Sequence, residues 1–155
     1  MKKWAVIIVS LLLVMVSADL SKAGDIEEIQ AISDKILEAR NTKDIDSYAD
    51  LIGGSMGYTH SFSNVLDYKK HSKEELKFMY KSWFKGYDSY EMTSVSRNIS
   101  IIGNTAITYG LRKLKYKKTG ALSQPEEKLL RVTNAYIKEN GKWKLVLFHS
   151  DTGAK

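Results

Sequence analysis

Residues 89–116 read SYEMTSVSRNISIIGNTAITYGLRKLKY, and this stretch decides the fold. On both sides of Gly103-Asn104, β-favouring side chains recur near every second position, which is the period of a strand. A Gly-Asn pair between two such runs is typical of a tight hairpin turn. The stretch therefore predicts two long antiparallel strands, over residues 89–102 and 105–116.

The two-residue period continues to the end of the chain. Residues 127–139 and 142–149 predict two further strands, which Asn140-Gly141 joins in a second tight turn. Residues 117–126 are polar and contain Gly120 and Pro125, so we expect a longer hairpin loop there.

The N-terminal half of the chain has a helical period instead. Apolar residues within 25–40 follow i, i+3, i+4 spacing, which predicts an amphipathic helix. Asp44 is placed to cap a second, short helix, and Gly53-Gly54-Ser55 is expected to end it.

Between the helical hairpin and the long strands we expect two short strands and a third helix. The strands are predicted over residues 56–62 and 65–68. Ser72 and Glu75 form a capping box, and the helix that follows runs to about Phe84. Helices first and a meander of strands last predict an α+β fold, a strongly bent antiparallel sheet whose concave face the helices cover.

The first residues have the pattern of an export signal. Lys2 and Lys3 precede an apolar run of about 15 residues, which is shorter than a membrane-spanning helix needs. Small residues at Ser21 and Ala23 predict cleavage after Ala23, with a site after Ala18 as an alternative. We therefore expect a signal peptide over residues 1–23, a single domain over 24–155, a periplasmic or secreted location, and no integral membrane segment after cleavage. A retained N-terminal anchor is the alternative.

Composition excludes several kinds of site. The 155-residue chain has no cysteine, so disulfides, thiolate metal sites and a cysteine nucleophile are ruled out. No known metal or nucleotide motif is present, and we expect no metal and no cofactor. The net charge is +6, and the basic residues gather at one hairpin end. We read these as protection of a sheet edge rather than as a nucleic-acid surface: Arg112, Lys113, Lys115, Lys117 and Lys118.

The order of the elements and three local phrases resemble the nuclear transport factor 2-like superfamily, and within it the SnoaL-like group of small bacterial domains. The phrases are YTHS at 58–61 before the capped helix, GNTA at 103–106, and GKWKLV at 141–146 before His149-Ser150. The resemblance covers residues 26 to about 151. It implies a cone-shaped, cystatin-like sheet closed by the helices, a pocket at its wide end, and often a homodimer through the sheet.

Two of the three histidines are candidates for acid–base chemistry. His149 follows Trp143, Leu145 and Leu147 at alternate positions, so strict alternation places it on the buried face of the sheet. His60 lies in a predicted strand near Tyr58. A histidine at the rim of an apolar pocket can exchange protons near neutral pH, whereas a neutral ring bonded to the backbone or to a tyrosine is the alternative. Asp151 is two residues beyond His149 and is able to orient it if the strand continues.

Further pocket residues follow from strand parity and residue type. Tyr58 and Tyr109 are candidate phenolic donors, and Trp83 supplies an aromatic wall. Arg131 shares a strand face with apolar residues, which suggests a bidentate carboxylate site, while a structural ion pair to a sheet carboxylate is the alternative.

Together these features predict an exported protein that binds a small apolar or weakly acidic molecule, with Tyr58, Trp83, Arg131, Tyr109 and the two histidines in its pocket. One alternative is a cofactor-independent lyase or isomerase with His60 or His149 as the general acid or base. Another is a homodimeric assembly module without a ligand.

Overall fold

The structure is a computed structural model that describes residues 23–61 and 67–152 of the chain. The N-terminal helix is described from residue 23 to residue 41. Helix α2 spans Ile45–Asp50 and α3 spans Lys73–Phe84. Asp44 caps α2 through a bond from Ser47 N, and Ser72 with Glu75 forms the capping box of α3, as predicted.

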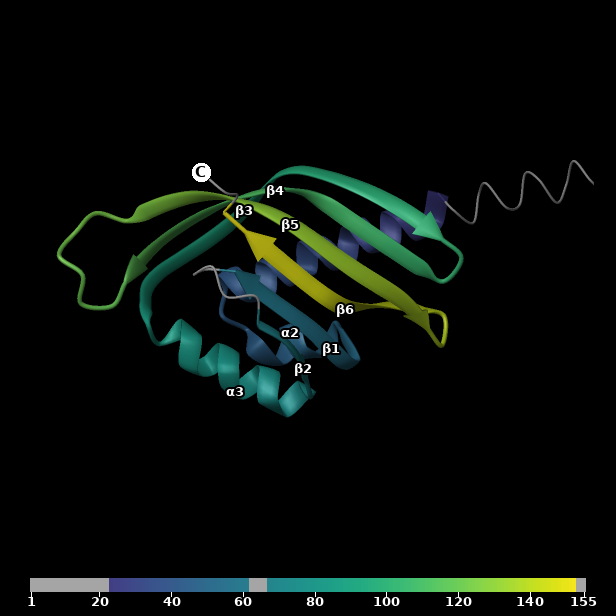
Figure 1. Cartoon of the computed structure of the whole chain (residues 1–155), viewed down its shortest axis with the longest axis horizontal. Helices are drawn as coiled ribbons and strands as arrows, with labels where there is room; N and C mark the ends of the chain where they lie inside the picture. Colours follow the sequence, from purple (N-terminus) through teal and green to yellow (C-terminus); the bar gives the residue numbers. More distant parts are fainter. Residues whose placement is uncertain (1–22, 62–66, 153–155) are drawn as a thin grey trace, which may run out of the picture.

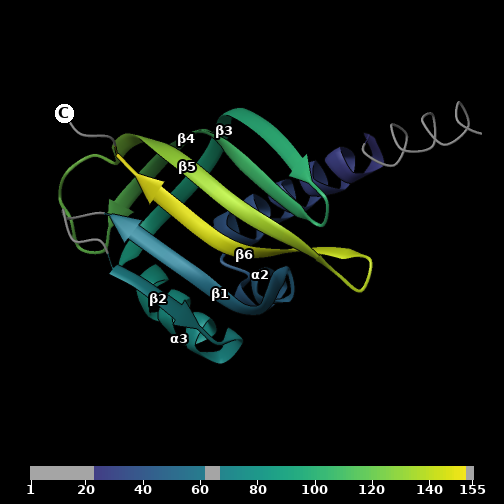
Figure 2. The ribbon, with the colours of Figure 1, turned by 45° about the vertical axis from the view of Figure 1, so that its right-hand side comes forward.

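Six strands make one sheet, and its spatial order is β2-β1-β6-β5-β4-β3. Figures 1 and 2 show this sheet as a curled layer. The strand bounds are β1 Ile52–Ser61, β2 Asp67–His71, β3 Tyr87–Ile102, β4 Thr105–Lys118, β5 Glu126–Glu139 and β6 Lys142–Asp151. The predicted α+β fold with a strongly bent sheet under N-terminal helices is confirmed.

One pairing departs from the predicted antiparallel arrangement. Strand β1 runs parallel to β6, whereas the other four neighbouring pairs are antiparallel. The two strands are far apart in the sequence, so no local turn pattern reports how they pair. The sheet is therefore mixed.

Strand β1 also begins earlier than expected. Gly53-Gly54-Ser55, predicted to end the helical hairpin, lies inside β1, and Leu145 N donates to Leu51 O just before it (3.1 Å). A Cβ on Gly53 would meet Val146 Cγ1 at 2.9 Å, so glycine lets the two strands approach here.

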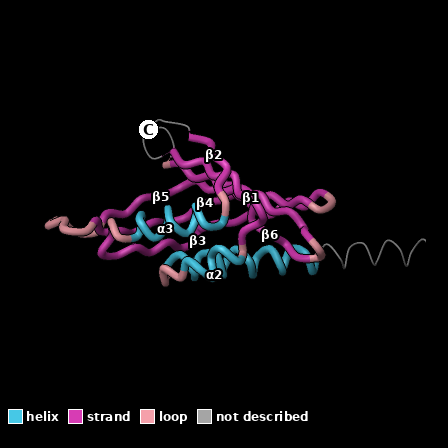
Figure 3. The backbone as a smooth tube through the Cα atoms, turned by 90° about the horizontal axis from the view of Figure 1, so that it is seen from below, coloured by secondary structure: helices cyan, strands magenta, loops and turns pink. Residues whose placement is uncertain are grey.

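The helices cover one face of the sheet, here called the inner face. In Figure 3 the N-terminal helix and α2 lie along one side of the strands, and in Figure 1 α3 lies under the curled sheet. The N-terminal helix buries Ile29, Ile36 and Leu37 against inner-face residues that include Leu130, Tyr136 and Trp143. The opposite, outer face carries no helix among the described residues. The fold thus offers two distinct surfaces, a covered interior and an open sheet.

Candidate functional site

His149 lies on the outer face of the sheet, so the prediction that it points into the interior is wrong. Tyr136 pairs with Leu145 and Ala135 pairs with Leu147, which leaves Val146 as an extra residue on β6. Such a β-bulge reverses the alternation of every later residue. Leu145 and Phe148 are therefore both buried, and His149 is half-buried on the other side.

The outer face brings three predicted residues together. His149 Nε2 lies 3.3 Å from Asp151 Oδ2, so the expected pairing of these two groups forms. Arg131 donates from Nε (2.9 Å) and Nη2 (2.8 Å) to Asp151 Oδ1. Asp151 thus links the two strands β5 and β6, and Arg131 takes the alternative role of an ion pair with a sheet carboxylate.

Arg131 and Tyr109 do not line the interior. Arg131 is an exposed residue of β5, between the buried Leu130 and Val132. Tyr109 is 51% exposed on β4. Arg131 was placed in the pocket because it shares a strand face with apolar residues, and Tyr109 because its phenol is a possible donor, but both lie on the open outer face.

Trp83 lies at one end of the interior, within an aromatic cluster. Its ring centroid is 4.9 Å from that of Phe84, 4.8 Å from that of Tyr87 and 5.0 Å from that of Tyr90. Tyr90 is buried, and burial raises the pKa of its hydroxyl, which therefore stays neutral. Trp83 therefore borders the interior through its contact with the Tyr90 ring.

Tyr58 and His60 are described only through the backbone of β1. Tyr58 pairs with Phe148 and His60 pairs with Ser150 in the parallel register. Their side chains are outside the described part of the structure. The same holds for His71, the third histidine.

The interior holds a residue that the sequence analysis assigned to a basic surface. Arg112 is 4% exposed, on the inner face of β4 beside Leu114. Its Nη1 lies 3.9 Å from Met92 Sδ, which is a weak acceptor. With the Asn134 amide turned so that its oxygen accepts, Arg112 Nη2 donates to it at 3.3 Å. No carboxylate among the described residues pairs with Arg112.

Burial and a second arginine shape the electrostatics of Arg112. Burial, and after it the positive charge of Arg40, lower the pKa of the Arg112 guanidinium to about 10. The group is still a cation at neutral pH. Removal from water disfavours this charge, so an anion beside it would be strongly stabilised.

Arg40 is the second buried arginine, at the C-terminal end of the N-terminal helix. It is 2% exposed, and its Nη2 donates to Tyr90 Oη at 3.3 Å. Its guanidinium carbon lies 4.7 Å from the ring centroid of Phe148, and that of Arg112 lies 6.0 Å from the same centroid. The two cations therefore approach one aromatic ring, which attracts them through its π face.

A small hollow lies beside Arg112, next to the irregular pairing of β3 with β4 at residues 94–96. Thr108, Asn134, Ser94 and Arg97 also line it. Its volume is about 10 Å³, which is room for roughly one water molecule.

Sequence signals for both arginines existed and were missed. Arg112 has the same strand parity as Leu114 and Tyr116, which are buried. Arg40 follows Ile36 by four residues and so lies on the apolar stripe of its helix. A charged residue on a buried face was the pattern to look for.

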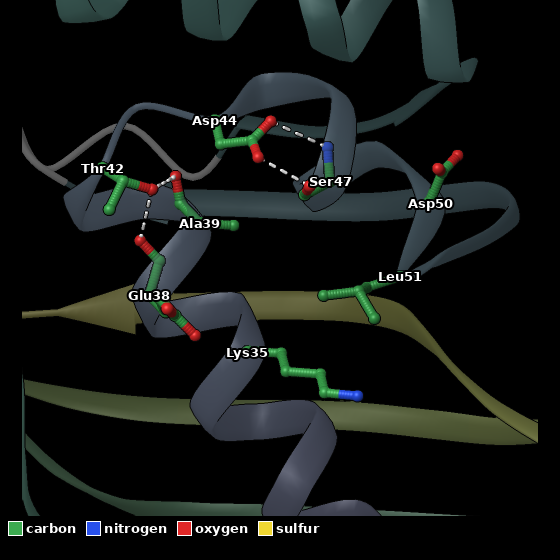
Figure 4. Close-up of a pocket in the computed structure, with 8 residues that line it drawn as sticks. All are labelled: Lys35, Glu38, Ala39, Thr42, Asp44, Ser47, Asp50 and Leu51. Atoms are coloured by element: carbon green, nitrogen blue, oxygen red, sulfur yellow. Dashed lines mark hydrogen bonds between the residues drawn. The ribbon is translucent and has the colours of Figure 1, made fainter.

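A second hollow, of about 400 Å³, lies between the N-terminal helix and α2 (Figure 4). Its acidic groups include Glu38, Asp44 and Asp50. The Asp44 carboxylate caps α2 and accepts hydrogen bonds from Ser47 Oγ (2.6 Å) and from the Ser47 backbone N (3.0 Å). These bonds lower the pKa of Asp44. No group of three metal-ligating side chains occurs among the described residues.

Comparison with known protein families gives a match over most of the chain. The sequence model of the calcium/calmodulin dependent protein kinase II association domain matches residues 25–154. The chain belongs to this association-domain family. A comparison with curated protein sequences gives no match.

Solved structures share the fold of this association-domain chain at low sequence identity. A Xanthomonas campestris protein assigned to the same family has a TM-score of 0.65 and 19% identity, covering 83% of this chain and 87% of that one. A nuclear transport factor 2-like superfamily protein from Salmonella enterica has a TM-score of 0.71 and 16% identity, and the match covers 83% of this chain and 91% of that one. Hexachlorocyclohexane dehydrochlorinase LinA-type3 from Novosphingobium barchaimii has a TM-score of 0.76 and 11% identity, and the match covers 88% of this chain and 91% of that one.

These likenesses confirm the predicted superfamily and fold. Within the superfamily, the matching family is the association domain, where the sequence analysis named the SnoaL-like group. The superfamily includes ligand-binding proteins, lyase-type enzymes and association domains, so the fold leaves the function open. No helix of the described residues is long and apolar enough to cross a membrane.

Proposed function

We propose that this association-domain protein binds a small organic anion, such as a short carboxylate, in its interior, with Arg112 as the anchoring cation. The observation that supports this function is the buried guanidinium of Arg112, whose described partners are a thioether and an amide. A guanidinium offers five N–H donors in a planar fork that matches a carboxylate. An incoming carboxylate therefore gains two charge-assisted hydrogen bonds and relieves a buried charge.

Neighbouring polar groups are held ready around that anchor. Asn134 lies within 3.3 Å of Thr108 Oγ1, and Tyr136 Oη lies 2.8 Å from Ser33 Oγ. These residues are all buried and come from the N-terminal helix and from β4 and β5. Groups fixed by such bonds lose little entropy when a ligand binds, which favours affinity.

Arg40 gives the site its second positive charge. Its positive charge is close enough to lower the pKa of Arg112, so an anion beside Arg112 is attracted by both groups. Because the hollow beside Arg112 is water-sized, we expect the ligand to be small, and the flexible Met92 side chain that contacts Arg112 would have to shift for a carboxylate to reach the guanidinium. We therefore propose a short carboxylate as the ligand class.

Calorimetric titration with acetate, propionate, butyrate and succinate tests this function. We expect at least one of them to bind the wild-type protein, and Arg112→Gln to weaken that binding by about tenfold or more. Arg131→Gln is the matched control, since it removes an arginine from the outer face and is expected to leave binding within about twofold. Equal loss in both variants, or no binding by any of the four, would refute an interior anion site.

We further propose that the chain forms a homodimer through the outer face of its sheet. Ile107, Tyr109 and Leu129 are 41%, 51% and 51% exposed on this face, and no helix of the described residues covers it. Exposed apolar side chains on adjacent strands are typical of a protein interface. Sedimentation of the purified protein at micromolar concentration is expected to give a dimer, and a monomer would contradict the proposal.

The proposal of export follows from the sequence of residues 1–23, most of which lies outside the described part. Fractionation of the native host, followed by N-terminal sequencing of the purified protein, is expected to give Gly24 as the first residue of an exported chain. A cytoplasmic protein that retains Met1 or Lys2 would contradict it. The lyase or isomerase alternative stays a prediction, since no specific observation favours it over binding.

A further inference from the structure

A second groove, distinct from the interior site, lies where the end of α3 meets the start of β3. It is lined by Lys43, Ile45, Lys81, Phe84, Lys85, Tyr87, Asp88 and Thr119, and is here called the lysine groove. Its volume is about 570 Å³, which falls in the range of small-molecule sites. Three ammonium groups and one carboxylate give it a net positive charge.

The apolar residues of the lysine groove belong to the core and are fixed in place. Phe84 and Ile45 are 5% and 6% exposed, and Tyr87 is half-buried. Phe84 packs in the aromatic cluster, with its ring centroid 5.3 Å from that of Tyr90. The groove therefore combines an apolar floor with a cationic rim.

Hydrogen bonds between segments far apart in the sequence hold the walls of the groove together. Lys43 Nζ donates to Tyr87 O at 3.1 Å, which ties the turn before α2 to β3. Thr119 Oγ1 donates to Lys85 O (3.0 Å) and Thr119 N donates to Gly86 O (2.9 Å), which ties the end of β4 to the end of α3. A ligand would thus meet a groove that is already formed.

The turn before α2 also contains an unusual backbone conformation. Lys43 has φ of 59°, in the left-handed region that a residue with a Cβ rarely adopts. It ends the N-terminal helix, because Lys43 N donates to Arg40 O (3.2 Å) and Asp44 N donates to Ala39 O (2.8 Å), the bond pattern of a Schellman cap. The Lys43 side chain lines the groove from this end of the helix.

Charge along α3 separates lysines with structural partners from those on the groove. Lys73, Lys77, Lys81 and Lys85 follow one another at four-residue spacing, which places them along one side of the helix. Lys77 pairs with Asp46 at 2.7 Å and Lys73 lies 3.9 Å from Asp50, so these two bridge α3 to α2. Among the described residues, neither Lys81 nor Lys85 forms an ion pair.

From this arrangement we propose that the lysine groove binds a soluble amphipathic organic anion, with its phosphate or carboxylate head on Lys43, Lys81 and Lys85 and its apolar body on Phe84, Ile45 and Tyr87. The rim matches the charge of such a head, and the floor matches its hydrocarbon part. The site is separate from the interior arginines, so the two proposals can fail independently.

Octyl phosphate is the probe, and amide NMR shifts with calorimetry are the measurements. We expect octyl phosphate to bind the wild-type protein and shift the amides of residues 81–88, and to bind at least about tenfold more tightly than inorganic phosphate or octanol. The double variant Lys81→Gln/Lys85→Gln is expected to weaken binding about tenfold or more. Lys73→Gln/Lys77→Gln, with the same charge change on the same helix, is expected to stay within about twofold.

Several results would overturn the proposal. Equal weakening in both double variants would show attraction to net charge alone. Binding that Arg112→Gln abolishes, with the lysine variants unaffected, would assign the probe to the interior. If inorganic phosphate bound as tightly as octyl phosphate, the apolar floor would contribute nothing to binding. Binding to phosphatidylglycerol vesicles without binding to octyl phosphate would indicate a membrane surface instead.

Discussion

Arg40 and Arg112 bring two buried positive charges to a single ring, that of Phe148, from a helix and a strand that are 72 residues apart in the chain. Like charges in a dry interior repel, and each also loses its hydration. A packed apolar residue in place of a buried charge is often as stable or more stable, so stability alone does not account for Arg112. This relationship leads to the first prediction.

Arg112→Met is expected to leave the ligand-free protein equally stable or more stable by about 1 kcal/mol, because methionine fills similar space without a buried charge. The same variant is expected to lose the affinity for short carboxylates. Urea unfolding with and without ligand measures both effects. A loss of more than about 2 kcal/mol in the ligand-free state would show that Arg112 serves structure instead.

Asp25 is expected to make the stability of the fold depend on acid pH. Hydrogen bonds from Lys138 and from Trp143 Nε1 lower the pKa of its carboxyl below the usual 3.8. A depressed pKa means that the ionised group stabilises the fold above about pH 4, and that this contribution is lost as the pH falls towards the folded-state pKa. These bonds join the N-terminal helix to β5 and β6.

Asp25→Asn is therefore expected to lower the free energy of unfolding by about 1 kcal/mol at pH 7, and the difference from wild type is expected to shrink below pH 4. Thermal unfolding between pH 2.5 and 7 measures this. Glu27→Gln, in the same exposed turn, is the control and is expected to change little. A difference that is constant with pH would contradict the assignment to the carboxylate.

Gly110 is expected to tolerate no side chain. A Cβ at this position would meet Ser96 O at 2.1 Å and Ser96 C at 2.8 Å, at the irregular pairing of β3 with β4. Since these are backbone atoms, the strands would have to separate. Gly110→Ala is expected to destabilise the fold by about 3 kcal/mol, measured by urea unfolding.

Gly24→Ala is the matched control for that variant. A Cβ on Gly24 meets nothing within 4 Å, and the residue is helical. Alanine is the better helix former, so this change is expected to be neutral or to stabilise by up to about 1 kcal/mol. Similar losses in the two variants would show that the approach of Ser96 does not determine the effect.

The parts of the fold that the sequence predicted are those with local causes. The capping box of Ser72 and Glu75 and the tight turns at Gly103 and Gly141 each depend on a few adjacent residues, and all are found in the structure. The parallel pairing of β1 with β6 was missed because it joins strands with no shared turn. Local pattern therefore fixes elements more reliably than it fixes their partners.

The candidate site was less predictable, and one residue explains why His149 was misplaced. Val146 is an extra residue in the pairing of β6 with β5, and nothing in the alternating run from Trp143 to His149 reveals it. A one-residue irregularity turns every later side chain to the other face. His149 was misplaced for that reason, whereas Arg112 was recoverable from parity alone.

The outer face provides the last prediction, which concerns assembly. Leu129 is 51% exposed on β5, on the face that carries Ile107 and Tyr109. If a second copy covers this face, Leu129→Glu buries an unpaired carboxylate in the interface and is expected to raise the dimer dissociation constant by about a hundredfold. Leu122→Glu is the matched control, because Leu122 is fully exposed in the loop between β4 and β5. Sedimentation equilibrium at several concentrations is expected to show a monomer for Leu129→Glu and a dimer for Leu122→Glu. A dimer of unchanged strength in both variants would mean that the chains associate through another surface.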